Sequence, residues 1–163
     1  MKVVNEQPPE WIMKGCLDKF RVHVEQTVWT YGDTIFAPDR DSSLPDHIIA
    51  HEEQHARQQS NQELMLKYIE PTERIDDEKL AGKMRDAWWK EFLSNPRFRL
   101  EQEAEAYGAQ YRFYCERVKD RNRRALFLMQ IAGHFSGPLY QLALSSTQAR
   151  KMIEVLSGQK QLL

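Results

Sequence analysis

The chain has 163 residues, of which 41% are hydrophobic and 29% charged, and its formal net charge at pH 7 is −1. These values are typical of a globular protein of one domain, spanning 1–163, and they give no electrostatic reason to expect a nucleic acid or an anionic membrane as partner. No stretch approaches the roughly 18 apolar residues of a membrane span, and the first residues lack the apolar run of a signal peptide. We therefore expect a cytoplasmic protein.

The segment 20–37 is rich in β-branched and aromatic residues and predicts a small antiparallel sheet. Residues 20–25 alternate between apolar and polar side chains, as in a half-buried strand. Gly32 and Asp33 offer a turn, and Pro38 is expected to end the sheet.

The next segment carries the signs of a helix start. Ser43 is a candidate N-cap, Pro45 would lie in the first turn, and Asp46 follows three residues after the cap. This pattern predicts a helix over 44–60.

The remainder of the chain is predicted to be helical. Apolar residues at every fourth position indicate one helix before an interruption at 94–96, and a three-four alternation indicates a second helix over 97–120. Further helices are predicted over 122–158, with breaks at Gly133 and at 137–138 and a serine cap on the last one. A short β-rich region followed by helices predicts a mainly helical α+β fold.

The stretch "HEEQH" begins at residue 51, inside the first of these helices. Residues four apart lie on one helix face, so His51 and His55 can present two imidazole nitrogens to one metal ion. Glu52 lies beside this pair, where a general base must lie in order to take a proton from an attacking water. The pattern predicts a zinc-dependent hydrolase with His51 and His55 as ligands and Glu52 as the base, provided that a third ligand comes from elsewhere.

Three glutamates on a later helix compete for the role of third ligand. At 100° per residue, Glu103 lies about 60° from the apolar stripe of its helix, Glu101 about 100° and Glu105 about 140°. Glu103 is therefore the carboxylate best placed to face the core, where a metal would supply the counter-charge that a buried carboxylate needs. Glu105 is expected on a solvated face, and Glu101 stays an alternative.

For several other residues, a role at the site and a purely structural role are both considered. His47 lies one turn before the motif and is expected to be exposed or to support a ligand. His134 could donate to a tetrahedral oxyanion, or it could have only a local role in a turn. Tyr107 and Tyr111 are expected mainly in the core, with a supporting role at the site as the alternative. Cys16 is expected to be a reduced thiol, because two cysteines are too few for a disulfide framework.

The arrangement resembles the gluzincins, the zincin group with HExxH on one helix and a ligand glutamate on a second. The order of sheet, HExxH helix, connecting segment and glutamate helix is similar to the compact minigluzincin core. "HEEQHARQQ" followed by "EAEAYGAQ" resembles small metallopeptidase-like proteins of phages and prophages that pair HExxH with an ExEAY stretch. The likeness covers about residues 20–115, and its specific part is these two motifs.

This resemblance implies a zincin-like domain that binds Zn²⁺ through His51, His55 and Glu103, with Glu52 as base. It implies a peptide or protein substrate, and the host cytoplasm as location if the protein is phage-encoded. The chain departs from the pattern at one position, because many gluzincins have an aspartate four residues after the ligand glutamate, where this sequence has Tyr107.

Two functions are therefore expected in competition. The first is a zinc metallopeptidase whose extended substrate pairs with a sheet edge near residues 33–37. The second is a non-catalytic interaction protein that keeps the zinc site as a structural clamp, or a self-blocked, proenzyme-like form. The presence of Glu52 favours the first, because a closed structural site does not need it, and the small size of the chain favours the second.

Overall fold

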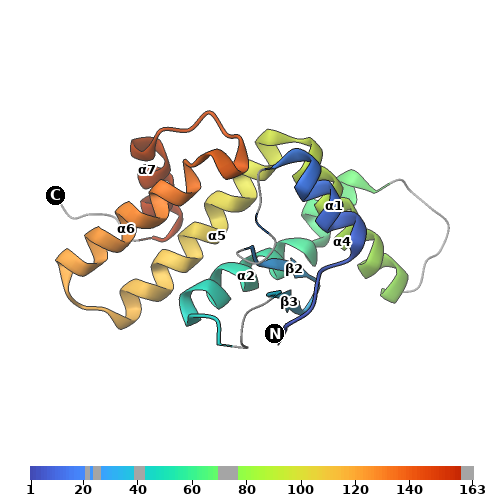
Figure 1. Ribbon diagram of the computed structural model, residues 1–163, viewed down its shortest axis with the longest axis horizontal. Helices are drawn as coiled ribbons and strands as arrows, with labels where there is room; N and C mark the ends of the chain where they lie inside the picture. The colour runs from blue at the N-terminus through green and yellow to red at the C-terminus, as the bar shows by residue number, and fades with distance from the viewer. Residues whose placement is uncertain (21–22, 24–26, 39–42, 70–76, 159–163) are drawn as a thin grey trace.

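The computed structural model describes residues 1–20, 23, 27–38, 43–69 and 77–158. A small sheet near the N-terminus packs against helices, which form most of the molecule, so the α+β class is confirmed (Figure 1). In chain order the elements, with η for a short 3₁₀ helix, are β1 (Lys2–Val4), α1 (Glu10–Lys19), β2 (Trp29–Tyr31), β3 (Thr34–Phe36), α2 (Asp46–Gln59), α3 (Gln62–Met65), η2 (Leu66–Tyr68), α4 (Asp77–Ser94), α5 (Pro96–Arg117), α6 (Arg121–Phe135), η3 (Pro138–Tyr140) and α7 (Ser146–Leu156).

Among the described residues, the sheet has three strands in the order β1-β3-β2 and is mixed rather than antiparallel. β2 and β3 are antiparallel and are joined by the predicted turn, where Gly32 has a φ of 63° that a residue with a Cβ rarely adopts. β1 pairs with β3 in parallel, and this strand was not predicted from the sequence. The structure also contains α1, which was not predicted.

The strand predicted over 20–25 is wrong at its first residue. Phe20 caps the C-terminus of α1, where its backbone N–H donates to the carbonyl of Cys16 at 2.7 Å. Of the other residues in this prediction, 21–22 and 24–25 lie outside the described residues.

The HExxH helix begins later than predicted, and Ser43 does not cap it. Pro45 is the N-cap residue, and its carbonyl accepts from the amides of Ile48 and Ile49. The physical reason is steric, because a residue that precedes a proline is disfavoured in helical geometry, and Leu44 precedes Pro45. A helix start at Leu44, which a cap at Ser43 would require, is therefore disfavoured, and α2 begins at Asp46.

The later helices follow the prediction closely. Asn95 caps α5 by accepting from the amides of Arg97 and Phe98, and Pro96 stands at the first helical position. The predicted break at Gly133 is wrong, because α6 continues to Phe135 before the chain turns.

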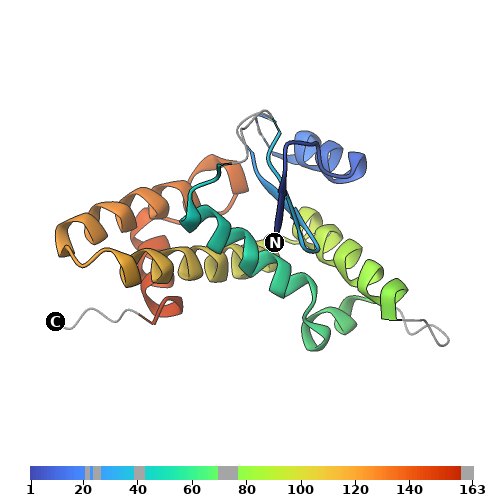
Figure 2. The ribbon, with the colours of Figure 1, turned by 90° about the horizontal axis from the view of Figure 1, so that it is seen from below.

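α5 connects the two larger of the three hydrophobic clusters found among the described residues. Its first turns, through Phe98, join a cluster with α1 and α4, and its later turns, through Tyr107 and Tyr111, join a second cluster with α6 and α7. α2 lies alongside the middle of α5, with the sheet on its other side (Figures 1 and 2). The contact between α2 and α5 is therefore the centre of the fold.

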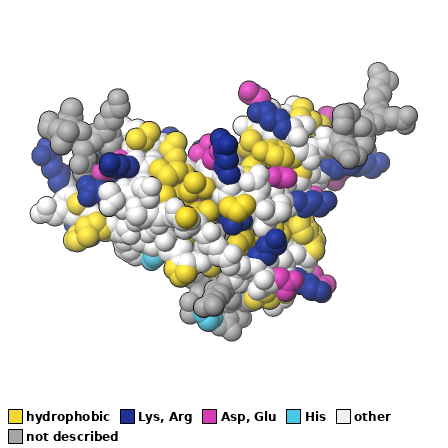
Figure 3. All heavy atoms as spheres, turned by 90° about the horizontal axis from the view of Figure 1, so that it is seen from above, with side chains coloured by type: hydrophobic (Ala, Val, Ile, Leu, Met, Phe, Trp, Pro, Cys, Tyr) yellow, Lys and Arg dark blue, Asp and Glu magenta, His cyan; other side chains and the backbone are white. Residues whose placement is uncertain are grey.

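Basic and acidic side chains are interspersed with hydrophobic ones on the face that Figure 3 shows, in keeping with the near-zero net charge. Among the described helices, none combines the length and apolar character that a membrane crossing requires.

The serine cap of the last helix is confirmed and gives a stability prediction. Ser145 accepts from the amide of Gln148 at 3.2 Å, and the side chain of Gln148 accepts from the amide of Ser145 at 2.9 Å. Ser145→Ala should lower the free energy of unfolding by about 1 kcal/mol, because it leaves a helix-end amide without its partner. Urea denaturation measures this, with the exposed Thr147→Ala as the matched control. An equal effect of both variants would contradict the capping role.

Candidate metal centre

Three buried side chains from two helices converge where α2 crosses α5. His51 and His55 lie one turn apart on the inner face of α2, and Glu103 faces them from α5 with only 3% of its surface exposed. One nitrogen or oxygen atom from each residue can be chosen so that all three lie within 4.8 Å of one another. This buried group could bind a metal ion, as the sequence predicted from the same residues.

The distances within the group suit a small divalent cation. The two Nε2 atoms are 3.2 Å apart, Nε2 of His51 is 3.5 Å from Oε2 of Glu103, and Nε2 of His55 is 3.6 Å from Oε1 of Glu103. Two ligand atoms that each lie about 2.0–2.1 Å from one tetrahedral ion are about 3.4 Å from each other. The three side chains therefore hold the separations of a coordination shell.

The hydrogen bonds of His55 show which way its ring nitrogens face. Its Nδ1 lies 2.9 Å from Oε1 of Gln58, whose Nε2 donates to the carbonyl of Gln102 at 3.0 Å and to Oε2 of Glu105 at 2.9 Å. Because that amide nitrogen is the donor, Oε1 of Gln58 must accept, so Nδ1 of His55 carries the proton. Nε2 of His55 then presents its lone pair towards Glu103.

His51 is held in the same way by a second glutamine. Its Nδ1 lies 3.2 Å from Oε1 of Gln110, whose Nε2 lies 3.0 Å from Nδ1 of His47. With the amide of Gln110 in this orientation, the proton of His51 is also on Nδ1. The two Nε2 atoms therefore face each other with lone pairs, which is repulsive unless a cation lies between them.

Glu103 adds a second unsatisfied group. Its Oε2 atom is buried and has no hydrogen-bond partner among the described residues. Burial lowers the pKa of both imidazoles, that of His55 to about 4, so neither ring supplies a positive charge near neutral pH. A divalent cation would satisfy the carboxylate oxygen and both lone pairs together, so the residues fit a metal ion.

Glu52 lies beside this group and is fixed from the sheet. Oγ1 of Thr30, on β2, donates to Oε2 of Glu52 at 2.8 Å. Burial raises the pKa of the Glu52 carboxyl to about 7, although the neighbouring His51 and the Thr30 hydroxyl lower it. The structure thus provides a buried carboxylate next to the three candidate ligands and outside their set.

The two competing glutamates lie elsewhere on α5. Glu101 is exposed and pairs with Arg97 at 3.0 Å. Glu105 is exposed and accepts from Gln58 and, at 3.4 Å, from Gln54. Of the three, only Glu103 belongs to the histidine group, as the helical-face argument predicted.

Of the remaining candidates, some lie near the histidine group or in the core, and one is exposed. His47 is half-buried and contacts Gln110, while His134 is exposed on α6 and is not brought to the group. Tyr107 packs edge-on against His51, with ring centroids 4.7 Å apart, and Tyr111 is buried in the core formed with α6 and α7. Cys16 is a free, buried thiol whose pKa is raised to about 11 by that burial.

A small cavity of about 80 Å³ adjoins the group. Its remaining walls are largely aromatic and aliphatic, and they come from α1, β2, α4 and η3 and from residues that directly follow α1 or precede β2. They are Cys16, Phe20, Thr27, Val28, Trp29, Thr30, Trp88, Trp89, Phe92, Leu139 and Tyr140. Direct access to the candidate ligands is therefore narrow.

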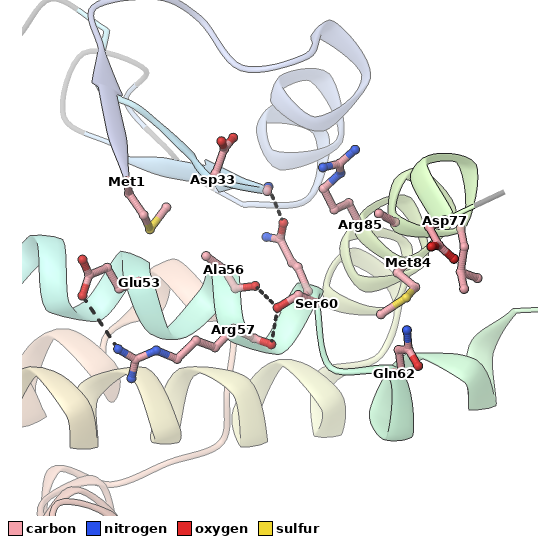
Figure 4. A pocket seen from close by; sticks show the side chains of 14 residues that line it. Met1, Asp33, Glu53, Ala56, Arg57, Ser60, Gln62, Asp77, Met84 and Arg85 are labelled. Atoms are coloured by element: carbon pink, nitrogen blue, oxygen red, sulfur yellow. Dashed lines mark hydrogen bonds and ion pairs between the residues drawn. The ribbon is translucent and has the colours of Figure 1, made fainter.

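A second cavity of about 750 Å³ lies between the exposed face of α2, the β2–β3 turn and α4. Glu53 and Arg57 line it from α2, and Arg85 reaches from α4 towards the turn (Figure 4). Its lining includes none of His51, His55 and Glu103. The chemistry-bearing residues thus belong to the small cavity rather than to the large one.

The polar residues that orient the group were not predicted from the sequence. Gln58 lies three residues after His55 and Gln110 seven after Glu103, so helical spacing alone could have placed each on the inner face of its helix. Thr30 comes from another element. No short-range pattern indicates that its hydroxyl reaches Glu52.

No family model, no curated protein and no solved structure matches this chain.

We predict that the purified protein binds about one zinc ion per chain, because two imidazoles and one carboxylate with an open position suit zinc. The His51→Ala/His55→Ala double variant should lose this ion. Metal analysis after dialysis against a weak chelator measures the stoichiometry. Equal zinc content in the two proteins would contradict the assignment.

We also predict that Glu103→Gln lowers zinc affinity by at least tenfold, because the amide supplies no charge to the ion. Glu101→Gln and Glu105→Gln are matched controls on the same helix and should retain wild-type affinity within a factor of three. Competition with a chromophoric chelator gives the affinities. If Glu101→Gln alone released the ion, the assignment of the third ligand would be wrong.

Proposed function

We propose that this protein is a zinc-dependent metallopeptidase of gluzincin type. The observation that carries the proposal is the placement of Glu52, a buried carboxylate directly beside the three candidate ligands and hydrogen-bonded to the sheet. A site built only to hold a metal needs no such group. The order of sheet, HExxH helix and glutamate helix supports the same proposal.

Different residues of the chain would have different roles in this reaction. A zinc ion held by His51, His55 and Glu103 would polarise the scissile carbonyl and acidify a water molecule. Glu52 would accept the proton of that water and pass it to the leaving amine. Gln58 and Gln110 would keep the two imidazoles in the orientation that leaves Nε2 free to bind the ion.

The sheet restricts how a substrate can bind. The expectation that an extended peptide pairs near residues 33–37 is wrong for β3, because β3 is the central strand and pairs with β1 on one side and β2 on the other. A peptide at the site would contact the lining of the small cavity, which includes Phe20, Leu139 and Tyr140. The small size of this cavity predicts a preference for short or flexible substrates.

The narrow cavity favours a second candidate function, a non-catalytic protein in which zinc clamps α2 to α5. A cavity of about 80 Å³ is smaller than the roughly 300–1,000 Å³ of most ligand pockets. In this case the metal would stabilise the fold without turning over a substrate. The two functions differ in what they require of Glu52.

Glu52→Gln separates the two. The amide keeps the shape and the acceptor oxygen but cannot take a proton, so zinc content and fold should be retained while hydrolysis falls by about 10²–10⁴-fold. Wild type and variant are compared on a mixed peptide library with saturating zinc, by mass spectrometry. Glu53→Gln, one residue further along α2 on its solvent-facing side, is the matched control and should cleave like wild type.

Each outcome of this screen is informative. Cleavage by wild type and Glu53→Gln, and none by Glu52→Gln, supports the peptidase. Equal cleavage by all three would show that Glu52 is not the base. No cleavage by any of them, with zinc bound, would favour the clamp.

A further inference from the structure

Thr30 is a central polar residue of the contact between the sheet and the HExxH helix. It lies in the middle of β2 and is 2% exposed. Its hydroxyl donates to Glu52 at 2.8 Å, and its carbonyl accepts from Nε2 of Gln59 at 2.8 Å and from Nε1 of Trp89 at 3.0 Å. One residue of the strand therefore bonds to α2 twice and to α4 once.

The contact of Gln59 with the sheet consists of two hydrogen bonds. Gln59 donates to the carbonyl of Thr30 and accepts from the amide of Gly32 at 2.8 Å. Glu52 and Gln59 are seven residues apart, or two helical turns, so they project from the same face of α2. These bonds fix the position of α2 along its own axis and its rotation about that axis, relative to β2.

A fixed helix does not by itself fix a carboxylate. The terminal torsion of a glutamate side chain is soft, so Glu52 could present either oxygen over a wide range of angles. The bond from the Thr30 hydroxyl engages Oε2 and holds the plane of the group, which leaves Oε1 to take a proton. The carbonyl of Thr30 is itself bonded to Gln59 and Trp89, so the residue that donates this hydroxyl is held in place.

We propose that Thr30 is the positioning residue of Glu52, setting the orientation in which the carboxylate meets the attacking water. This inference rests on the proposed peptidase function for its catalytic consequence. The carbonyl of Thr30 has a related effect, because Gln59 and Trp89 occupy the edge of β2 that an extended peptide would otherwise pair with. Strand β2 thus serves to orient the base rather than to bind substrate.

The kinetic test compares Thr30→Val with Thr30→Ser. Valine keeps the shape and removes the hydroxyl, so kcat should fall by about 10–100-fold with KM and zinc content little changed. Serine restores the hydroxyl and should recover most of kcat. The matched control is Thr34→Val on β3, whose hydroxyl donates to the neighbouring, exposed Asp33 at 3.1 Å, and it should behave like wild type.

Two kinetic results would overturn the proposal. If Thr30→Val and Thr34→Val had the same kcat, the hydroxyl would have no positioning role. If serine failed to recover kcat, the effect of valine would come from packing rather than from the hydrogen bond.

A stability measurement tests the interaction without any activity. Thr30→Val and Glu52→Ala should each lower Tm, and the double variant should lose less than the sum of the two, because each single change removes the same buried bond. Additive losses would contradict the bond. If wild type cleaved no peptide, the proposed function would fail while this cycle still decided whether Thr30 holds Glu52.

Discussion

The interaction on which this structure depends is the burial of the Glu103 carboxylate against two imidazoles that carry no charge. A carboxylate moved away from water costs several kcal/mol unless a counter-charge or good hydrogen bonds replace the solvent. The neighbouring Tyr140 hydroxyl offsets part of this cost by lowering the pKa of Glu103, which burial raises. Oε2 of Glu103 is still left without a hydrogen-bond partner. A divalent cation held between α2 and α5 would resolve this imbalance and would tie together the two helices at the centre of the fold.

Neutral and charged side chains around this group orient its histidines through hydrogen bonds. Glu105 accepts from Gln58, and Gln58 contacts His55, so one amide links a surface carboxylate to a buried candidate ligand. Gln110 bridges His47 and His51 in a similar way. α2 is thus held on the α5 side by glutamines and on the sheet side by Thr30. Both attachments leave the histidine Nε2 atoms facing Glu103.

Much of the site could be predicted because it depends on helical periodicity. The spacing of His51 and His55 and the angle of Glu103 from its apolar stripe both follow from 100° per residue, which holds wherever a helix forms. Thr30 could not be found this way, since its contact with Glu52 joins residues 22 apart through tertiary packing. β1 was missed because a three-residue strand is stabilised by its partner β3 rather than by its own pattern. Ser43 was misassigned because the constraint that Pro45 places on Leu44 outweighs capping preference.

The central claim is that His51, His55 and Glu103 bind zinc while Glu52 and Cys16 do not. X-ray absorption at the zinc edge of the loaded protein tests it most directly, since it counts donors and measures bond lengths. We expect only nitrogen and oxygen donors at about 2.0–2.1 Å, with the multiple-scattering signature of two imidazoles. A sulfur donor at about 2.3 Å, which Cys16 would supply, or a signal from fewer than two imidazoles, would contradict it.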